Sequence, residues 1–281
     1  MKTGSIGQGR QHNGQHCLAS ALYIMNKHQA KTQRVNDGCE LSYFHYPNEN
    51  KPTVLLSHSL GVTQDMWQPQ LNELQQHFNV LTYDMRGHGG SEVFPGYYSM
   101  DRLGNDVIQL LDALEIERVH FCGLSIGGMI GQWLAFYYPE RLSSLVLANT
   151  SACISPPSLW QQRIEMVLKA GMSAIWKPLL TRWFTPSFID ADPVSIDKTK
   201  SMFLSIDAKG YAGCCAAIRD MDLRRFETAN QLPTLVIAGT QDVATPPEQS
   251  HYLVEQYSKG GLVELDAAHL SNIEQADKFT A

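Results

Sequence analysis

From residue 31 onward, short apolar runs alternate with longer segments in which apolar residues recur at helical spacing. A short apolar run bounded by turn residues predicts a buried strand, whereas recurrence every three to four residues predicts a helix. Strands that alternate with helices form a parallel sheet covered on both faces, which explains why runs such as LVLA and LVIA lack polar alternation. The pattern therefore predicts an α/β fold with a mostly parallel sheet.

The individual elements follow from the same pattern. A hairpin is expected where the runs at 32–35 and 39–46 flank an Asp37-Gly38 turn. The remaining strands are expected at 52–59, 79–85, 118–124, 142–149, 233–239 and 261–268. Helices are expected at 66–78, 100–116, 126–138 and 247–257, and a last helix begins at 271.

The alternation stops between residues 152 and 227. This stretch contains no convincing strand, and prolines separate helical patterns such as those at 158–172 and 210–221. We therefore predict a helical cap at 152–227, inserted after the strand at 142–149. The α/β core would then comprise residues 31–151 and 228–281.

Residues 1–30 differ from the rest, because a polar, Gly- and Gln-rich stretch precedes a short apolar run. One interpretation is a secretory signal, since Lys2 and Arg10 precede an apolar run of about signal-peptide length. The interpretation that we favour is an upstream extension, disordered or wrongly started, with Met25 as the natural start. The folded domain would then begin near Lys31.

Composition narrows the class of partner and the compartment. The formal net charge is −6 and the basic residues are scattered, so we expect no nucleic-acid partner. No apolar stretch reaches the roughly 18 residues of a membrane helix, so we expect no membrane association. The six cysteines have no regular spacing and form no Cys-x-x-Cys pair, which favours reduced thiols and a cytoplasmic protein.

One serine lies at a point where the backbone barely tolerates a side chain. Ser125 is the centre of a Gly-x-Ser-x-Gly motif, Gly123 to Gly127, between a predicted strand and a predicted helix. This arrangement is typical of the nucleophile elbow of α/β-hydrolases, in which a strained turn lifts the serine hydroxyl above the carboxyl edge of the sheet. We therefore expect Ser125 to be a nucleophile.

A serine nucleophile needs a base, and the base needs an orienting carboxylate. In this fold the two follow the serine in the order acid, then histidine. His269 lies just beyond the last strand and is the one histidine with both the position and the order; Asp242 follows the preceding strand. Asp266 is too near His269 along the chain, and the strand at 142–149 ends without an acid.

The tetrahedral oxyanion of such a reaction needs backbone donors. We expect the N–H of Ile126 and, from the loop after the strand at 52–59, the N–H of Leu60. The Gly-rich loop YDMRGHGGS, at 83–91, lacks the phosphate-binding patterns, and metal-ligand spacings such as His-Glu-x-x-His are absent from the sequence. We therefore expect no cofactor and no metal.

Several segments together resemble one family. Over residues 31–281 the chain resembles the α/β-hydrolase superfamily, and more narrowly the 3-oxoadipate enol-lactonases of the β-ketoadipate pathway. The segment GYAGCCAAIRDMDLR, in the predicted cap, is the most specific for substrate, because caps diverge quickly between enzymes that act on different substrates. The serine that follows His58, Ser59, is also similar to the residue that this family has there. The segments are SHSLGVTQDMW, YDMRGHGGS, FCGLSIGGMIGQW, RWFTP, GYAGCCAAIRDMDLR, AGTQDVATPP and ELDAAHLSNIE.

The resemblance implies ring opening of 3-oxoadipate enol-lactone, a small-molecule lactone, during bacterial degradation of catechol or protocatechuate. Because this substrate carries a carboxylate, a cation of the cap would bind it, and the sequence does not choose among the arginines there. Trp133 and Trp67 would either line the pocket or pack in the core. The candidate arginines are Arg163, Arg182, Arg219, Arg224 and Arg225.

Two other functions stay open. A generic carboxylesterase or a cofactor-free haloperoxidase-like hydrolase would share the Ser125 motif but not the cap segment. A receptor on the same fold would bind a small molecule without turnover. A substrate panel separates the first from a lactonase, and removal of the Ser125 hydroxyl separates the second.

Overall fold

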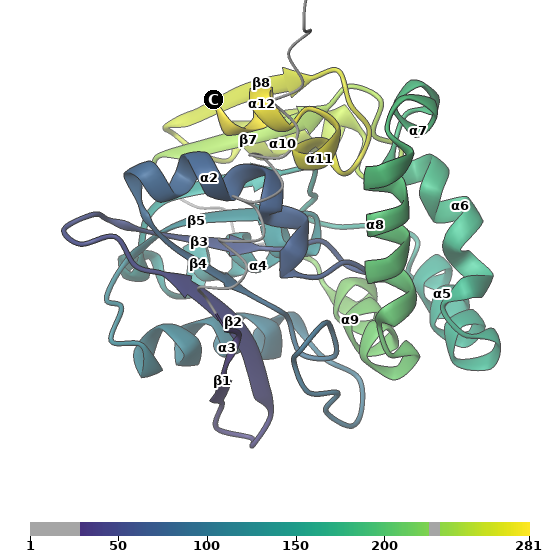
Figure 1. Cartoon of the computed structure of the whole chain (residues 1–281), viewed down its shortest axis with the longest axis horizontal. Coiled ribbons are helices and arrows are strands. Elements are labelled where there is room, and N and C mark those ends of the chain that lie inside the picture. The colour runs from purple at the N-terminus through teal and green to yellow at the C-terminus, as the bar shows by residue number, and fades with distance from the viewer. Residues whose placement is uncertain (1–28, 225–230) are drawn as a thin grey trace, which may run out of the picture. The chain divides into compact units, whose positions relative to one another are not determined.

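A single mixed sheet organises the part of the chain that the computed structural model describes, residues 29–224 and 231–281 (Figure 1). In that part, eight strands follow the spatial order β1-β2-β4-β3-β5-β6-β7-β8. β2 pairs antiparallel with β1 and β4, and the other pairs are parallel. The strands are β1 (Lys31–Arg34), β2 (Glu40–Tyr46), β3 (Thr53–Ser57), β4 (Asn79–Tyr83), β5 (Val119–Leu124), β6 (Leu142–Ala148), β7 (Thr234–Gly239) and β8 (Gly260–Leu265).

The parallel strands end at one common edge of the sheet, where ligands bind in open α/β folds. Their cores are apolar on both faces: Leu55 and Leu56, adjacent in β3 and therefore on opposite faces, are both buried. The hairpin turn before β2 uses Gly38 at φ 95°, a value that suits glycine. The predicted α/β fold with a mostly parallel sheet is therefore confirmed.

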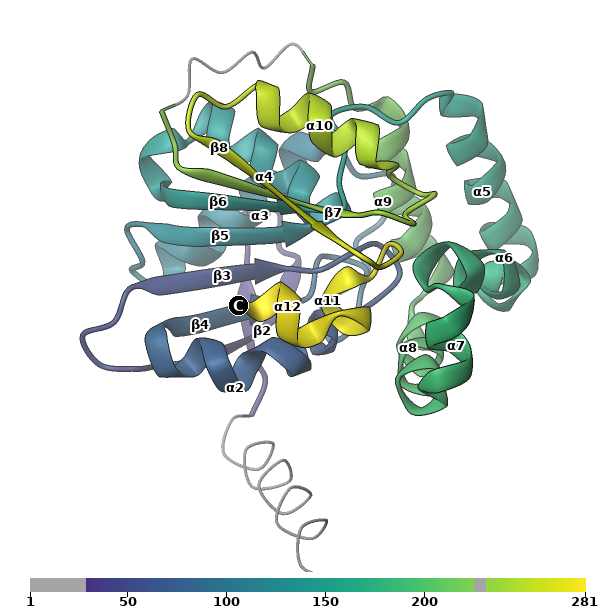
Figure 2. The ribbon, with the colours of Figure 1, turned by 90° about the horizontal axis from the view of Figure 1, so that it is seen from above.

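Helices cover both faces of the sheet (Figure 2). They are η1 (Gln64–Trp67), α2 (Gln68–His77), α3 (Met100–Ala113), α4 (Ile126–Tyr137), η2 (Pro139–Arg141), α10 (Pro247–Glu255), α11 (Ser271–Glu274) and α12 (Ala276–Thr280). α2 and α12 pack together on one face, and α3, α4 and α10 lie on the other. The last helix, expected to run on from 271, is interrupted at Gln275, whose backbone is not helical.

Beyond the carboxyl edge of the sheet lies a group of helices that we call the insertion, α5 to α9 (Figure 1). They are α5 (Pro157–Ala170), α6 (Ser173–Trp183), α7 (Pro186–Ala191), α8 (Pro193–Ser205) and α9 (Ala208–Asp220). α9 rests directly on the core, because a Cβ on Gly87 would lie only 2.4 Å from Gly210 Cα. The predicted boundary at 227 and the predicted N-terminal extension up to residue 28 lie outside the described residues.

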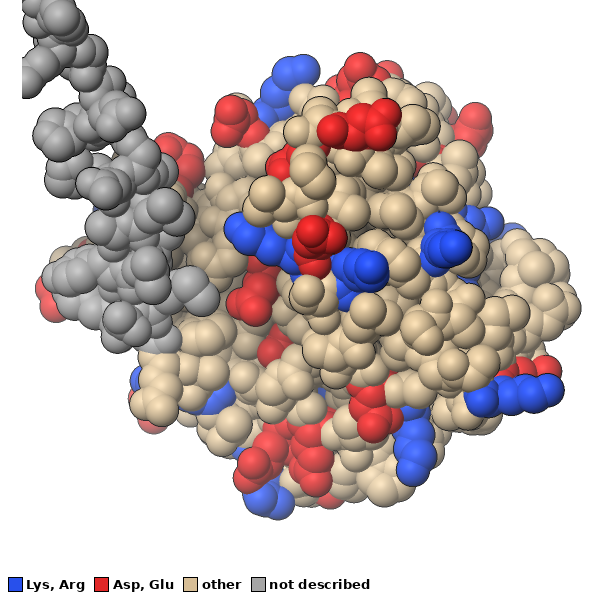
Figure 3. Space-filling view, turned by 45° about the vertical axis from the view of Figure 1, so that its right-hand side comes forward, with Lys and Arg blue, Asp and Glu red and all other residues tan. Residues whose placement is uncertain are grey.

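On the face shown in Figure 3, acidic and basic side chains are interspersed over a mostly uncharged surface.

The loop after β4 contains an arginine, Arg86, whose side chain points into the protein and binds two carboxylates. Arg86 is buried, and its guanidinium donates to Asp106 at 2.6 Å and to Asp37 at 2.9 Å. Burial opposes the charge, but these two carboxylates hold the pKa of Arg86 above its ordinary value. This loop is therefore fastened to the core.

Two further properties of the described residues concern membrane-spanning helices and free thiols. None of its helices is both long enough and apolar enough to cross a bilayer. The cysteines at 39, 122, 153, 214 and 215 are free, and all but Cys153 are buried. Burial raises the pKa of the Cys122 thiol to about 12, so that this thiol stays protonated at neutral pH.

Candidate active site

A strained turn carries Ser125 between β5 and α4. Its φ of 60° and ψ of −119° cost a non-glycine residue about 1–3 kcal/mol. The turn requires glycine neighbours: a Cβ on Gly123 would lie 2.2 Å from the carbonyl oxygen of Gly127, and a Cβ on Gly127 would lie 2.2 Å from that of Ser57. The expected elbow is therefore present, and its serine lies at the carboxyl edge of the sheet.

A buried imidazole–carboxylate pair lies at the same edge. His269 Nδ1 donates to Asp242 Oδ2 at 2.8 Å. The backbone N–H groups of Ala244 and Thr245 donate to Oδ1 at 2.7 and 3.0 Å, and the Thr245 hydroxyl donates to Oδ2 at 2.8 Å. Burial raises the pKa of Asp242, but the interaction with His269 and these hydrogen bonds outweigh it, so the pKa lies below its ordinary value. The carboxylate is thus ionised and held in one orientation.

Asn149, just after β6, is a partner of this carboxylate that the sequence alone does not single out. Its side-chain Nδ2 donates to Asp242 Oδ2 at 2.9 Å and to the carbonyl of Ala268 at 3.2 Å. Its side-chain oxygen accepts from the Ser271 hydroxyl. The φ of 44° at Asn149 suits asparagine better than most residues. The signal for Asn149 in the sequence is that an asparagine, and not an acid, follows this strand.

The loop that carries His269 is tied to the insertion. The N–H of Leu270 donates to the carbonyl of Trp183, the last residue of α6, at 3.0 Å. Glu274 adds a second link, because its carboxylate accepts the N–H of Ala268 at 3.0 Å and the hydroxyl of Thr185. The position of His269 therefore depends on α6 and on the start of α7.

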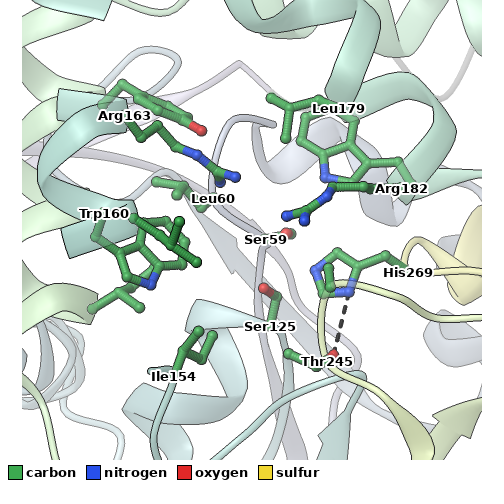
Figure 4. Close-up of a pocket in the computed structure, with 15 residues that line it drawn as sticks. Ser59, Leu60, Ser125, Ile154, Trp160, Arg163, Leu179, Arg182, Thr245 and His269 are labelled. Carbon is green, nitrogen blue, oxygen red and sulfur yellow. Dashed lines mark hydrogen bonds between the residues drawn. The ribbon is translucent and has the colours of Figure 1, made fainter. Parts of the chain in front are cut away.

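Ser125 and His269 line one pocket between the sheet edge and the insertion (Figure 4). The Ser125 hydroxyl lies beside the imidazole of His269 in this view. Because Nδ1 of His269 is engaged with Asp242, Nε2 is the ring nitrogen left for the serine. These two described residues share no hydrogen bond, and catalytic hydrogen bonds of this kind often tighten only when substrate binds.

Two backbone amides offer donors at the pocket. Ile126 opens α4, so its N–H has no partner within the helix. In the loop after β3, the N–H of Ser59 donates to Met66 Sδ at 3.3 Å and the N–H of Gly61 donates to His88 at 3.1 Å. The N–H between them, that of Leu60, has no acceptor among the described residues, and Leu60 lines the pocket.

Two arginines of the insertion reach over the same pocket, Arg163 from α5 and Arg182 from α6 (Figure 4). Neither forms an ion pair with a carboxylate of the described residues, whereas Arg219 and Arg224 are paired with neighbouring aspartates. The Arg163 guanidinium lies 4.7 Å from the centroid of the Trp160 ring, which supports it. The pocket therefore combines a serine and a histidine with two available cations.

The structure places two of the candidate substrate contacts, Trp133 and Trp67, away from this pocket. Trp133 does not line this pocket: it is buried against α3, and its indole N–H donates to Asp101 at 2.6 Å. Substrate binding by Trp133 is therefore wrong, because α4 turns that face into the core. Trp67 is likewise buried and packs against Phe279. Arg225 lies outside the described residues.

Metal ions have no evident ligand set here: within 29–224 and 231–281, no three His, Cys, Asp or Glu side chains gather as a metal site. The pocket's ionisable groups are instead suited to acid–base chemistry and to binding an anion.

Comparison with known proteins identifies the family of this chain. The family described as alpha/beta hydrolase fold matches residues 52–170. The chain is 41% identical to 3-oxoadipate enol-lactonase 2 of Acinetobacter baylyi, over 85% of this chain and 90% of the relative. It is 33% identical to the putative carbamate hydrolase RutD of Agrobacterium fabrum, over 81% of this chain and 90% of the relative.

Among solved structures, the enol-lactonase from Burkholderia xenovorans LB400 superposes with a TM-score of 0.87 at 41% identity, covering 89% of this chain and 96% of that chain. Sequence and structure thus agree over nearly all of the relatives' length. The chain belongs to the α/β-hydrolase superfamily and, within it, to the family of the 3-oxoadipate enol-lactonases.

Proposed function

We propose that this carboxylic-ester hydrolase opens 3-oxoadipate enol-lactone to 3-oxoadipate, with Ser125 as nucleophile, His269 as base and Asp242 as orienting acid. One observation carries the proposal: Ser125 and His269 share a pocket with two arginines that have no carboxylate partner in the described residues. An acyl-transfer site beneath cations that have no carboxylate partner in the described residues suits a cyclic ester that bears a carboxylate. The relatives named 3-oxoadipate enol-lactonase support the same substrate.

The reaction begins when His269 Nε2 takes the hydroxyl proton of Ser125 and Oγ bonds to the lactone carbonyl carbon. The carbonyl π electrons move to oxygen, and the N–H groups of Leu60 and Ile126 stabilise this oxyanion, each by about 3 kcal/mol. When the carbonyl re-forms, the ring C–O bond breaks. The departing enolate leaves easily, because protonation from His269 and tautomerisation convert it to a ketone.

Hydrolysis of the acyl-enzyme repeats these steps with water. His269 removes a proton from the water as its oxygen attacks the acyl carbon, and the Ser125 oxygen leaves with that proton. Asp242 supports both halves, because its ionised carboxylate holds the Nδ1 side of the ring and stabilises the imidazolium. The product is a dicarboxylate, so the charge on the bound molecule increases beneath the arginines.

Arg163 and Arg182 supply the preference for an anionic substrate. A charge-assisted hydrogen bond contributes about 1.5–3 kcal/mol, which corresponds to about 10- to 100-fold in affinity. A neutral ester would gain none of this. We further infer that the reaction belongs to bacterial degradation of aromatic compounds in the cytoplasm, where buried thiols such as Cys122 stay reduced.

The test compares an anionic and a neutral ester. Loss of the ultraviolet absorbance of the enol-lactone gives kcat and KM, and p-nitrophenyl acetate serves as the neutral substrate. Ser125→Ala should lower turnover of both by at least about 10³-fold. Arg182→Gln and Arg163→Gln should raise KM for the lactone by about 10- to 100-fold and leave the neutral ester nearly unchanged.

Arg219→Gln is the matched control, since this arginine of α9 is paired with Asp220 and does not line the pocket. It should change neither KM. Faster turnover of neutral aryl esters than of the lactone would favour a general carboxylesterase. Full activity of Ser125→Ala would exclude the serine mechanism, and small-molecule binding without any turnover by the wild-type protein would indicate a receptor.

A further inference from the structure

We propose that the buried pair His58 and His88 is the positioning device of the oxyanion hole, because these rings hold the two peptide groups that flank the Leu60 Cα. The inference rests on the oxyanion role proposed above for Leu60. Neither histidine lines the pocket, so both would act through the loop rather than on the substrate.

His58 fixes the peptide that contains the proposed donor. Its Nδ1–H donates to the carbonyl oxygen of Ser59 at 2.7 Å. That carbonyl and the N–H of Leu60 belong to one planar trans peptide, in which they point in opposite directions. A carbonyl held on the buried side therefore directs the N–H of Leu60 away from His58.

His88 fixes the next peptide. Its Nε2 accepts the N–H of Gly61 at 3.1 Å, and Gly61 has a φ of 84°. The opposite side of this glycine is closed by rings of the insertion: a Cβ on Gly61 would lie 3.1 to 3.2 Å from Tyr211, Phe203 and Trp183. The loop is thus clamped between the two histidines and the aromatic side chains of α6, α8 and α9.

The arrangement requires both rings to be neutral with the proton on Nδ1. His58 Nε2 accepts the N–H of Met85 at 2.9 Å, which leaves Nδ1 as the donor. The two rings lie 5.3 Å apart between centroids and are fully buried. Burial lowers the pKa of His58 to about 4 and that of His88 to about 3, so both rings are uncharged at neutral pH.

A probe that forms an oxyanion distinguishes positioning from mere folding. Trifluoroacetophenone accepts Ser125 Oγ at its carbonyl carbon; the serine proton passes to His269 and the ketone oxygen becomes an oxyanion. Adipate binds without forming one. His58→Leu should weaken inhibition by trifluoroacetophenone and lower kcat by about 10- to 100-fold, whereas the Kd of adipate should change by less than about twofold.

Two further variants frame the result. His58→Asn keeps an amide donor near the position of Nδ1 and should recover most of the lost kcat. His120→Leu is the matched control, because this half-buried histidine bonds Ser144 at the opposite edge of the sheet; it should affect neither ligand selectively. Equal weakening of both ligands in His58→Leu, or no change in either, would overturn the inference while Ser125→Ala remained inactive.

A measurement on the wild-type protein covers the case in which His58→Leu does not fold. With 15N-labelled histidine, the nitrogen resonances of both rings at neutral pH should show a protonated Nδ1 and an unprotonated Nε2. A proton on Nε2 of His58 would refute the inference, since Nδ1 could not then donate to Ser59. If instead Ser125→Ala kept full turnover, the proposed function itself would fail.

Discussion

Mild acid should destabilise the protein through its buried histidines, and His58 makes the effect measurable. An unfolded histidine has a pKa near 6.5, whereas burial lowers that of folded His58 to about 4. The unfolded chain therefore binds more protons between these values. The free energy of unfolding that His58 supports is fully present above about pH 6.5 and falls as the pH drops toward about 4.

The magnitude follows from the shift. One proton contributes about 1.4 kcal/mol for each pH unit, so the full interval of about 2.5 units corresponds to about 3 kcal/mol. Between pH 7 and pH 5 the loss is about 2 kcal/mol. Burial raises the pKa of Asp84 and Asp106, which has the opposite effect on the pH dependence. A difference between two proteins that share these carboxylates removes their contribution.

Urea unfolding of the wild type and of His58→Gln at pH 7 and pH 5 provides that difference. The glutamine does not titrate, so the wild type should lose about 2 kcal/mol more than the variant between the two pH values. The variant will be less stable at both pH values, which does not affect this comparison. Parallel losses, with a difference below about 0.5 kcal/mol, would show that His58 is not buried as a neutral ring.

The remaining predictions concern single substitutions. Asp242→Asn should lower kcat by about 10⁴-fold at pH 7 with little loss of stability, as measured by the lactone assay and thermal unfolding. Gly87→Ala should destabilise by more than about 2 kcal/mol, because its Cβ would overlap Gly210, whereas Gly171→Ala, at the same φ of 76° but in open space, should cost only about 1 kcal/mol in urea unfolding. Trp133→Phe should lower Tm and leave KM unchanged; a raised KM would restore Trp133 as a substrate contact.

The alternation of strands and helices could be predicted because each element has a strong local signal. Every parallel strand carries a short apolar run, and α3 shows a continuous buried stripe from Leu103 to Leu111. Inside the insertion the signal is weaker. α6, for example, contains Pro178, a residue that usually breaks a helix, yet the helix continues through it.

The candidate site was predictable only in part, because some of its residues have a local sequence signal and others are brought together only by packing. The Gly123 and Gly127 spacing predicts a strained turn from the sequence alone, since no other residue fits there. The contact between Asn149 and Asp242 depends on which loops meet at the carboxyl edge of the sheet. Which arginines line the pocket, here Arg163 and Arg182, depends on where side chains point after the insertion has docked. Packing within the core also decides which face of α4 meets Gly104, and therefore which of the two alternatives for Trp133, pocket lining or core, is realised.

The link between Leu270 and Trp183 has a consequence for how specificity diverges in this family. If the insertion only covered the pocket, it could be exchanged between relatives as an independent module. Here its main chain holds the loop that bears His269, so a grafted replacement must reproduce that anchor as well as a new binding surface. Chimaeras that swap the segment while ignoring the anchor should retain ligand affinity yet turn over slowly.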